Sequence, residues 1–187
     1  MFKVINKIGK SYDLNVALVF DGGVEICEHI SAENRALIKR LIDKKEFSGK
    51  KGELLKVDFL EKENLISMAL LGMGKEEEFT FDVYREVMFD FLSKEKGTVL
   101  ISSDKAILSN HEVLGEIVSN VNYSFDTFKE KKAEKLEVEL FVAGEEKNIS
   151  ETILLGEATD IARDLVDLPA NIINPITLAQ RVVELGA

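Results

Sequence analysis

Apolar residues recur along the chain at two spacings, which predict strands alternating with amphipathic helices. Short apolar runs predict strands over residues 2–5, 14–20, 54–60, 65–71, 98–101 and 136–142. Residues 14–20 are almost entirely apolar, as in a strand buried on both faces, whereas residues 136–142 alternate glutamates with apolar residues, as in a half-exposed strand near a sheet edge. A turn at Asp21-Gly22 could lead back through residues 24–27 as a hairpin, which favours a mixed sheet.

Helical spacing of apolar residues predicts three helices between these strands. Ser31, Thr80 and Asn110 stand where N-cap residues are expected. Gly97 stands where the glycine that ends the second helix is expected. The apolar positions of the three helices are Leu37, Ile38, Leu41 and Ile42, then Tyr84, Val87, Met88, Phe91 and Leu92, then Val113, Leu114, Ile117, Val118 and Val121.

The last 40 or so residues predict two more helices and a change of domain. Asn148, followed by Glu151, suggests a capping box at the start of a long helix. We expect its apolar stripe, Leu154, Ala158, Ile161 and Leu165, to face protein on more than one side. The long helix should end at Pro169, and a further helix should begin at Asn174-Pro175 and end at Gly186. Both prolines of the chain lie in this region, so we expect an N-terminal domain over residues 1–147 and a linker helix with the start of a second domain over residues 148–187.

Charge and composition exclude several classes of partner. The net charge of −10 opposes binding to nucleic acid or to an anionic membrane. The basic cluster Lys129, Lys131, Lys132 and Lys135 is interleaved with glutamates, as on a solvated face. A single cysteine excludes an intrachain disulfide, and neither a signal peptide nor an apolar run of roughly 18 residues is present, so we expect a cytoplasmic protein.

Three groups of residues carry weak signals for chemistry. Gly72-Met73-Gly74-Lys75 could cradle a phosphate, but it lacks the P-loop spacing and precedes three glutamates, so we interpret it as a tight structural turn. Cys27 and His29 have metal-ligand spacing, yet His111 is the only other histidine and no second cysteine exists to complete a structural zinc site. Ser102, Ser103 and Asp104 with His111 lack the nucleophile-elbow pattern of a hydrolase.

The segment from Ala162 to Asn171, with the sequence Ala-Arg-Asp-Leu-Val-Asp-Leu-Pro-Ala-Asn, and the following Pro175 and Leu178-Ala179 resemble the domain-junction signature of the leucyl aminopeptidase family. The usual family form has asparagine where this chain has Asp167. Two upstream segments agree in order and spacing. Residues 47–53 resemble the glycine-lysine-glycine turn of the family, and residues 71–75 resemble the turn before its arginine-containing helix, here with Arg85.

The resemblance implies a three-layer α/β fold like that of a macro domain, a mixed sheet with helices on both faces, followed by a long linker helix. In the family this helix leads to a catalytic domain with two divalent metal ions, zinc or manganese, which removes N-terminal amino acids from peptides. The metal-binding motifs of that domain do not occur in this sequence. We therefore expect the non-catalytic N-terminal part of a leucyl aminopeptidase, with no catalytic, metal-binding or substrate-binding residue and no cofactor of its own.

The expected partners are the missing catalytic domain and, for the parent enzyme, peptide substrates and further copies of itself. Arg163 and Asp164 would hold the linker geometry or pair with the catalytic domain rather than take part in chemistry. An alternative is a free-standing macro-like module that binds a nucleotide such as ADP-ribose, although no convincing phosphate loop is present. A third interpretation is DNA binding, which the net charge opposes.

Overall fold

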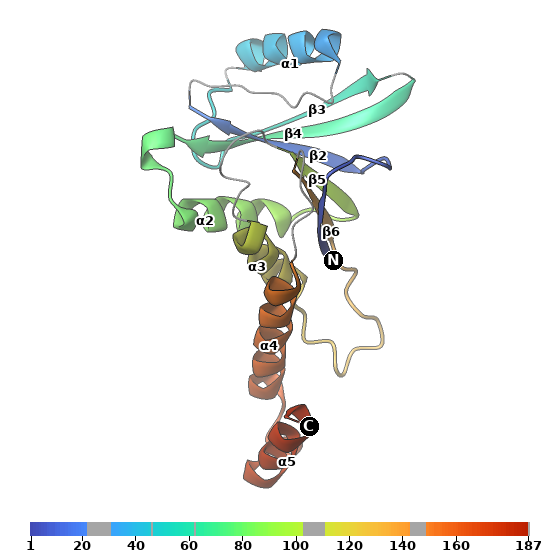
Figure 1. The fold of residues 1–187 in the computed structure, drawn as a ribbon, viewed down its shortest axis with the longest axis vertical. Coiled ribbons are helices and arrows are strands. Elements are labelled where there is room, and N and C mark those ends of the chain that lie inside the picture. The colour runs from blue at the N-terminus through green and yellow to red at the C-terminus, as the bar shows by residue number, and fades with distance from the viewer. Residues whose placement is uncertain (22–30, 46, 62, 103–110, 143–148, 187) are drawn as a thin grey trace.

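The computed structural model describes residues 1–21, 31–45, 47–61, 63–102, 111–142 and 149–186. Strands and helices alternate through most of this length (Figure 1). The elements in chain order are β1 (Phe2–Ile5), β2 (Leu14–Phe20), α1 (Ala32–Lys45), β3 (Leu54–Glu61), β4 (Asn64–Gly74), the short 3-10 helix η1 (Glu76–Glu78), α2 (Phe81–Leu92), β5 (Thr98–Ser102), α3 (His111–Asn122), β6 (Glu137–Phe141), α4 (Ser150–Asp167) and α5 (Pro175–Leu185).

The described strands form one mixed sheet in the order β1-β6-β5-β2-β4-β3. All neighbouring pairs are parallel except β3 and β4, which form an antiparallel hairpin. The mixed sheet was predicted, but its antiparallel pair comes from this hairpin, and residues 24–27 lie outside the described residues. Strand β6 lies next to the edge strand β1, and every residue of β2 is buried, so both predictions for these strands are confirmed.

Helices cover both faces of the sheet, which confirms the predicted three-layer α/β fold (Figure 1). Helix α1 buries Ile38 and Ile42 against one face, with Val19, Phe59 and Met68 among the strand residues beneath it. Helices α2 and α3 cover the other face, where most of the core lies. Their buried apolar residues are Tyr84, Val87, Met88, Phe91 and Leu92 of α2 and Val113, Leu114, Ile117 and Val118 of α3.

Local capping signals correctly placed several helix ends. The Thr80 side chain accepts a hydrogen bond from the Val83 amide at the start of α2, and Ser31 Oγ accepts one from the Asn34 amide near the start of α1. Asn174 and Pro175 begin α5 with a capping box, and Gly186 is its C-cap. Asn110, the predicted cap of α3, lies outside the described residues.

Two capping predictions were wrong. Helix α2 ends at Leu92 with Ser93 as its C-cap, so Gly97 does not terminate it. Gly97 instead has a φ of +78° in the turn before β5, where a β-carbon would clash with the Asp13 carboxylate. The N-cap of α4 is Ile149, without a side-chain hydrogen bond, rather than Asn148 paired with Glu151. The preceding residues 143–148 lie outside the described residues.

Candidate functional site: the α3–α4 junction

Helix α4 is attached to the sheet domain through α3 (Figure 1). The contact is a seam of small residues, Gly115 and Ser119 on α3 and Thr152 and Gly156 on α4. A β-carbon on Gly156 would lie 2.6 Å from Ser119 Oγ, and one on Gly115 would clash with the Thr152 side chain. The two helix backbones therefore approach closely, because these positions carry little or no side chain.

The contact with α3 does not use the first two positions of the predicted apolar stripe of α4, which corrects that part of the prediction. Thr152 and Gly156 are the buried residues of α4, whereas Leu154 is 64% exposed and Ala158 is also exposed. Ile161 and Leu165 are half-buried. The spacing of apolar residues identified an apolar face of α4. The face that packs against α3 is instead the one with the smallest side chains, because the two helices approach closely at Gly115.

A polar clamp joins the C-terminal halves of α3 and α4. Arg163 Nη2 donates a hydrogen bond of 2.6 Å to Asn120 Oδ1, and the guanidinium lies 5.1 Å from the centroid of the Tyr123 ring. The Tyr123 hydroxyl donates to Asp167 Oδ2 at 2.9 Å and is 3.2 Å from Asp164 Oδ1. Arg163 and Asp164 thus contact the same tyrosine, which lies just after α3, and so attach α4 to α3.

Asp160 is the carboxylate that pairs with the clamp arginine, whereas Asp164 and Asp167 accept hydrogen bonds from Tyr123. Arg163 Nη1 lies 3.7 Å from Asp160 Oδ1. Burial raises the pKa of Asp160, although Arg163 opposes this shift. Desolvation, with hydrogen bonds to Asp167 and Asp164, raises the pKa of Tyr123. Tyr123 therefore stays a neutral donor at physiological pH, suited to holding two carboxylates rather than to transferring a proton.

Two grooves flank the seam. One of about 400 Å³ lies between α2, α3 and α4 and contains Arg85, which bridges to Glu116 at 3.1 Å and to Asp82 at 3.3 Å. The other, of about 620 Å³, includes the apolar side chains of Phe2, Ile149 and Ile153. Within the described residues, no group of three or more histidine, cysteine, aspartate or glutamate side chains could hold a metal ion.

The two glycine turns singled out in the sequence pack against each other. The Gly74 amide donates to Gly49 O at 2.9 Å, and the Gly72 amide donates to Glu53 O at 2.8 Å. The Glu53 carboxylate accepts hydrogen bonds of 3.0–3.1 Å from the Ser48, Gly49 and Lys50 amides. Because these amides bind the protein itself, the geometry supports a structural turn and offers no open phosphate cradle.

The Glu53 carboxyl is ionised more easily than an ordinary glutamate. Burial alone would raise its pKa, but the hydrogen bonds from Ser48, Lys50 and Gly49 together outweigh burial and lower the pKa. The carboxylate thereby ties the segment between α1 and β3 into one turn.

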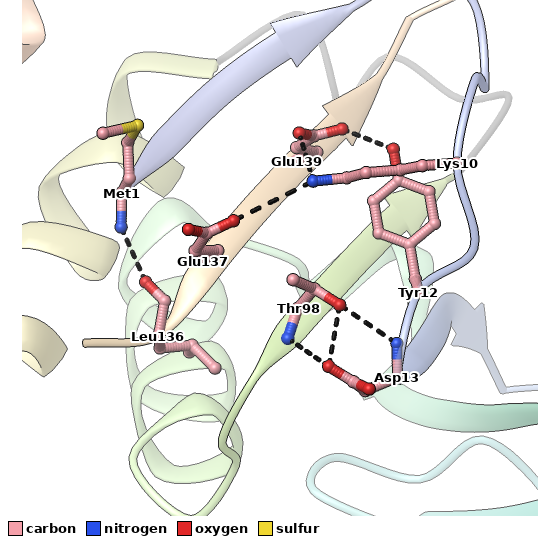
Figure 2. Close-up of polar contacts among 8 residues, drawn as sticks. All are labelled: Met1, Lys10, Tyr12, Asp13, Thr98, Leu136, Glu137 and Glu139. Carbon is pink, nitrogen blue, oxygen red and sulfur yellow. Dashed lines mark hydrogen bonds and ion pairs between the residues drawn. The ribbon is translucent and has the colours of Figure 1, made fainter. Parts of the chain in front are cut away.

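A second polar cluster, which the sequence did not indicate, joins the segment between β1 and β2 to strand β6 (Figure 2). The Lys10 ammonium is 3.0 Å from Glu139 Oε1 and 5.3 Å from the Tyr12 ring centroid, and the Tyr12 hydroxyl donates to Glu139 Oε2. Desolvation and Glu139 raise the pKa of Tyr12. Beside this cluster, the Asp13 carboxylate accepts hydrogen bonds of 2.8 Å from Thr98 N and Oγ1. These contacts attach the segment between β1 and β2 to the sheet.

The remaining candidate residues do not assemble into a described site. Cys27, His29, Ser103 and Asp104 lie outside the described residues, while Ser102 ends β5 and His111 begins α3. The basic cluster between Lys129 and Lys135 is exposed, and Lys129 Nζ pairs with Asp126 Oδ1 at 2.8 Å. No helix in the described part of the chain is long and apolar enough to cross a membrane.

Comparison with known proteins identifies relatives over nearly the whole chain. Residues 17–132 match the family model of the cytosol aminopeptidase family, N-terminal domain. A probable cytosol aminopeptidase of Fusobacterium nucleatum is 30% identical over 186 residues, which cover 99% of this chain and 39% of that protein. A probable cytosol aminopeptidase of Aquifex aeolicus is 32% identical over 90% of this chain and 36% of its own length.

Solved structures show the same fold. A mutant form of tomato leucine aminopeptidase has a TM-score of 0.66 at 16% identity and covers 98% of this chain and 41% of its own. The bottromycin maturation enzyme BotP has a TM-score of 0.66 at 18% identity, with 94% of this chain and 37% of its own covered. The chain thus spans less than half the length of the relatives that it matches.

Proposed function

Because the chain belongs to the cytosol aminopeptidase family, through the N-terminal domain of that family, we propose that it is the non-catalytic N-terminal part of a leucyl aminopeptidase. The parent enzyme would remove N-terminal amino acids from peptides. The observation that carries this proposal is the alignment of 99% of this chain with only 39% of an aminopeptidase, within which the family match is to the N-terminal domain.

The metal chemistry of the parent would reside in the part of the enzyme that this chain does not contain. The family is metal-dependent, and we propose zinc or manganese as the two ions that would activate water there. The sequence lacks the metal-binding motifs expected for that part, and the clamp residues Arg163, Tyr123 and Asp164 bind one another. The described residues support a role in positioning rather than in hydrolysis.

We propose that α4 is the linker helix and that the domain boundary lies near residues 147 and 148. The exposed side chains of α4 and α5 support this, because apolar surface on this scale is rarely left to water. The most exposed apolar side chains of the two helices are Leu154, Leu155, Val166, Ile176, Val182 and Val183. The catalytic part of the enzyme would cover them, while Thr152 and Gly156 fix the helix on α3. We further propose a cytoplasmic location and a homo-oligomeric parent.

Joining the chain to a catalytic part tests the proposal. The region of the Fusobacterium nucleatum relative that follows the aligned residues would be fused after Ala187, and hydrolysis of a leucine arylamide would be measured with zinc or manganese. We expect no turnover by the 187-residue chain alone and turnover by the fusion. Turnover by the purified chain alone, surviving repurification, would contradict the proposal.

Changing Arg163 to alanine in the fusion separates positioning from catalysis. Loss of the clamp should lower activity without changing the pH profile, since Arg163 acts on the orientation of α4. Replacing Lys94 of α2, which forms an exposed ion pair with Asp90 at 2.8 Å, provides a matched surface control. An unchanged activity in the Arg163 variant would rule out the linker role of the clamp.

A further inference from the structure

Strand β3 is an outer strand of the sheet, and its outward-facing backbone groups follow a regular pattern. The Gly72 amide donates to Glu53 O at 2.8 Å, so hydrogen bonds to β4 alternate from Glu53 onward along the antiparallel register. The even-numbered residues from Leu54 to Leu60 therefore direct their backbone N–H and C=O groups away from β4. Asn34 Nδ2 donates to Leu60 O at 2.9 Å, which agrees with this direction.

The same even-numbered positions carry exposed side chains of complementary kinds. Leu54 is 45% exposed and Leu60 is 67% exposed, and between them lie the exposed Lys56 and Asp58. Leu55, Val57 and Phe59 point to the opposite face, where they pack with α1. Leu65, 70% exposed on β4, pairs directly with Leu60. The outer strand thus presents the order apolar, positive, negative, apolar.

We propose that β3 pairs with β3 of a second copy of this chain, antiparallel, about a two-fold axis through Val57. This register places Lys56 opposite Asp58 of the second copy, and Leu54 opposite Leu60, with both pairs repeated by symmetry. Val57 then faces its own symmetry mate in a non-hydrogen-bonded pair. The sheet becomes continuous through both copies, and the outward backbone groups of both strands are paired. The Leu60 carbonyl, which already accepts a hydrogen bond from Asn34, uses its second lone pair for Leu54 of the second copy.

Charge selects this register over its neighbours. A slip of two residues in one direction places Lys56 opposite Lys56 of the second copy. A slip of two residues in the other direction places Asp58 opposite Asp58 of the second copy. Both arrangements bring like charges together, which destabilises a strand pair. A slip of one residue would turn every side chain of one strand to the other face. The placement of one positive and one negative residue on β3 therefore favours a single symmetric register. Charges of one sign along the strand would instead repel a second copy in every register.

The side chains of Lys56 and Asp58 already have partners within the chain, and these contacts are compatible with pairing. Lys56 Nζ lies 2.7 Å from Glu95 Oε1, and Ser67 Oγ donates to Asp58 Oδ1 at 2.6 Å. Lysine carries three donors and a carboxylate accepts several hydrogen bonds, so each can bind a second partner. Glu95 would then hold the Lys56 ammonium beside Asp58 of the second copy.

Cross-linking tests the register directly. Opposing residues of a non-hydrogen-bonded antiparallel pair have Cα atoms roughly 4.5 Å apart, within the range of a disulfide. We expect Val57→Cys, in a chain that also carries Cys27→Ser, to form a covalent dimer on oxidation. Leu55→Cys in the same background is the matched control, because Leu55 would face Phe59 of the second copy and should not cross-link. Circular dichroism would verify that both variants are folded.

Charge reversal tests the pairing by a second route. In analytical ultracentrifugation at physiological salt, Asp58→Lys should weaken the dimer about tenfold or more, because the substitution occurs twice at the symmetric interface. Mixing the Asp58→Lys and Lys56→Asp variants should restore association. Asp90→Lys on α2 makes the same charge change at an exposed ion pair with Lys94 and should leave the dimer unchanged.

Two outcomes would overturn the proposal. The first is a chain that remains monomeric at all accessible concentrations. The second is a dimer whose affinity is unchanged by Asp58→Lys and that forms no disulfide in the Val57→Cys variant. This result would indicate that the chains associate through the apolar faces of α4 and α5. The proposal does not depend on the aminopeptidase function, because neither test uses activity.

Discussion

The guanidinium of Arg163 on α4 lies 5.1 Å from the ring centroid of Tyr123 just after α3, and the hydroxyl of the same ring donates to Asp167 one turn further along α4. One tyrosine therefore contacts two successive turns of α4. The face of α4 that packs against α3 is otherwise made of small residues such as Gly156, so little apolar surface is buried there. The orientation of α4 consequently depends on polar contacts more than on a hydrophobic core.

Replacing Tyr123 by phenylalanine should loosen α4 while leaving the sheet domain intact. The ring under Arg163 remains, but the hydrogen bonds to Asp164 and Asp167 are lost, and the loss of global stability should be small because these bonds are open to solvent. Native-state hydrogen exchange should show faster exchange in α4 and unchanged protection in β2. Equal acceleration in both elements would instead show that α4 and the sheet unfold together.

Removing the charge of Glu53 should destabilise the turn between α1 and β3. Glu53→Gln retains the size of the side chain but weakens three hydrogen bonds from backbone amides, so we expect a loss of about 1–2 kcal/mol in the free energy of unfolding. Urea denaturation at neutral pH measures this loss. Glu63→Gln, at an exposed position just before β4, is the control and should change stability little.

The Glu53 contribution should also depend on pH in a defined direction. Its pKa is lower in the folded chain than the ordinary value of 4.5, so the folded state binds fewer protons at this site. The stabilisation is present above pH 4.5 and is lost as the pH falls through the folded pKa. The difference in unfolding free energy between the unsubstituted chain and Glu53→Gln should therefore become smaller as the pH is lowered. A difference that does not change with pH would contradict this linkage.

The sequence predicted the parts of the fold that depend on neighbouring residues. Thr80 caps α2 and Asn174 caps α5, because each side chain accepts hydrogen bonds from backbone amides within the next three residues. The apolar residues of α2 are buried at the positions that their spacing predicts. The residues of α4 that pack on α3 were not identified from the sequence, because their close contact depends on Gly115, in another helix of the chain. The Lys10 and Glu139 contact was not predictable, since it requires the fold to bring β6 beside the segment after β1.

Enlarging Gly156 should displace α4 without unfolding the sheet domain. A β-carbon at this position would lie 2.6 Å from Ser119 Oγ, so Gly156→Val forces the two helices apart. The helix would lose its close contact with α3, and the distance between probes on α4 and α2 should become broadly distributed in double electron–electron resonance. Ala158→Val, on the exposed side of α4, controls for the branched side chain. A narrow, unshifted distribution for Gly156→Val would contradict the close-packing argument.

Two glycines of the paired turns should respond differently to alanine, because they are required for different reasons. Gly52 has a φ of +74°, and no atom lies within 4 Å of the place that a β-carbon would occupy. Gly52→Ala should therefore cost about 1–2 kcal/mol through backbone strain alone. At Gly72, a β-carbon would clash with the Lys50 carbonyl, which backbone hydrogen bonds hold in place. Gly72→Ala should destabilise the chain by several kcal/mol, as in a severe overpacking.

Asparagine distinguishes these two causes. Asn tolerates the left-handed region better than alanine, so Gly52→Asn should recover part of the loss seen in Gly52→Ala. At Gly72 the larger side chain can only worsen the clash, so Gly72→Asn should be at least as unstable as Gly72→Ala. Thermal denaturation of the four variants measures both comparisons. A Gly72→Ala variant as stable as Gly52→Ala would show that the two turns can separate at little cost, and that their contact does not fix the end of β4.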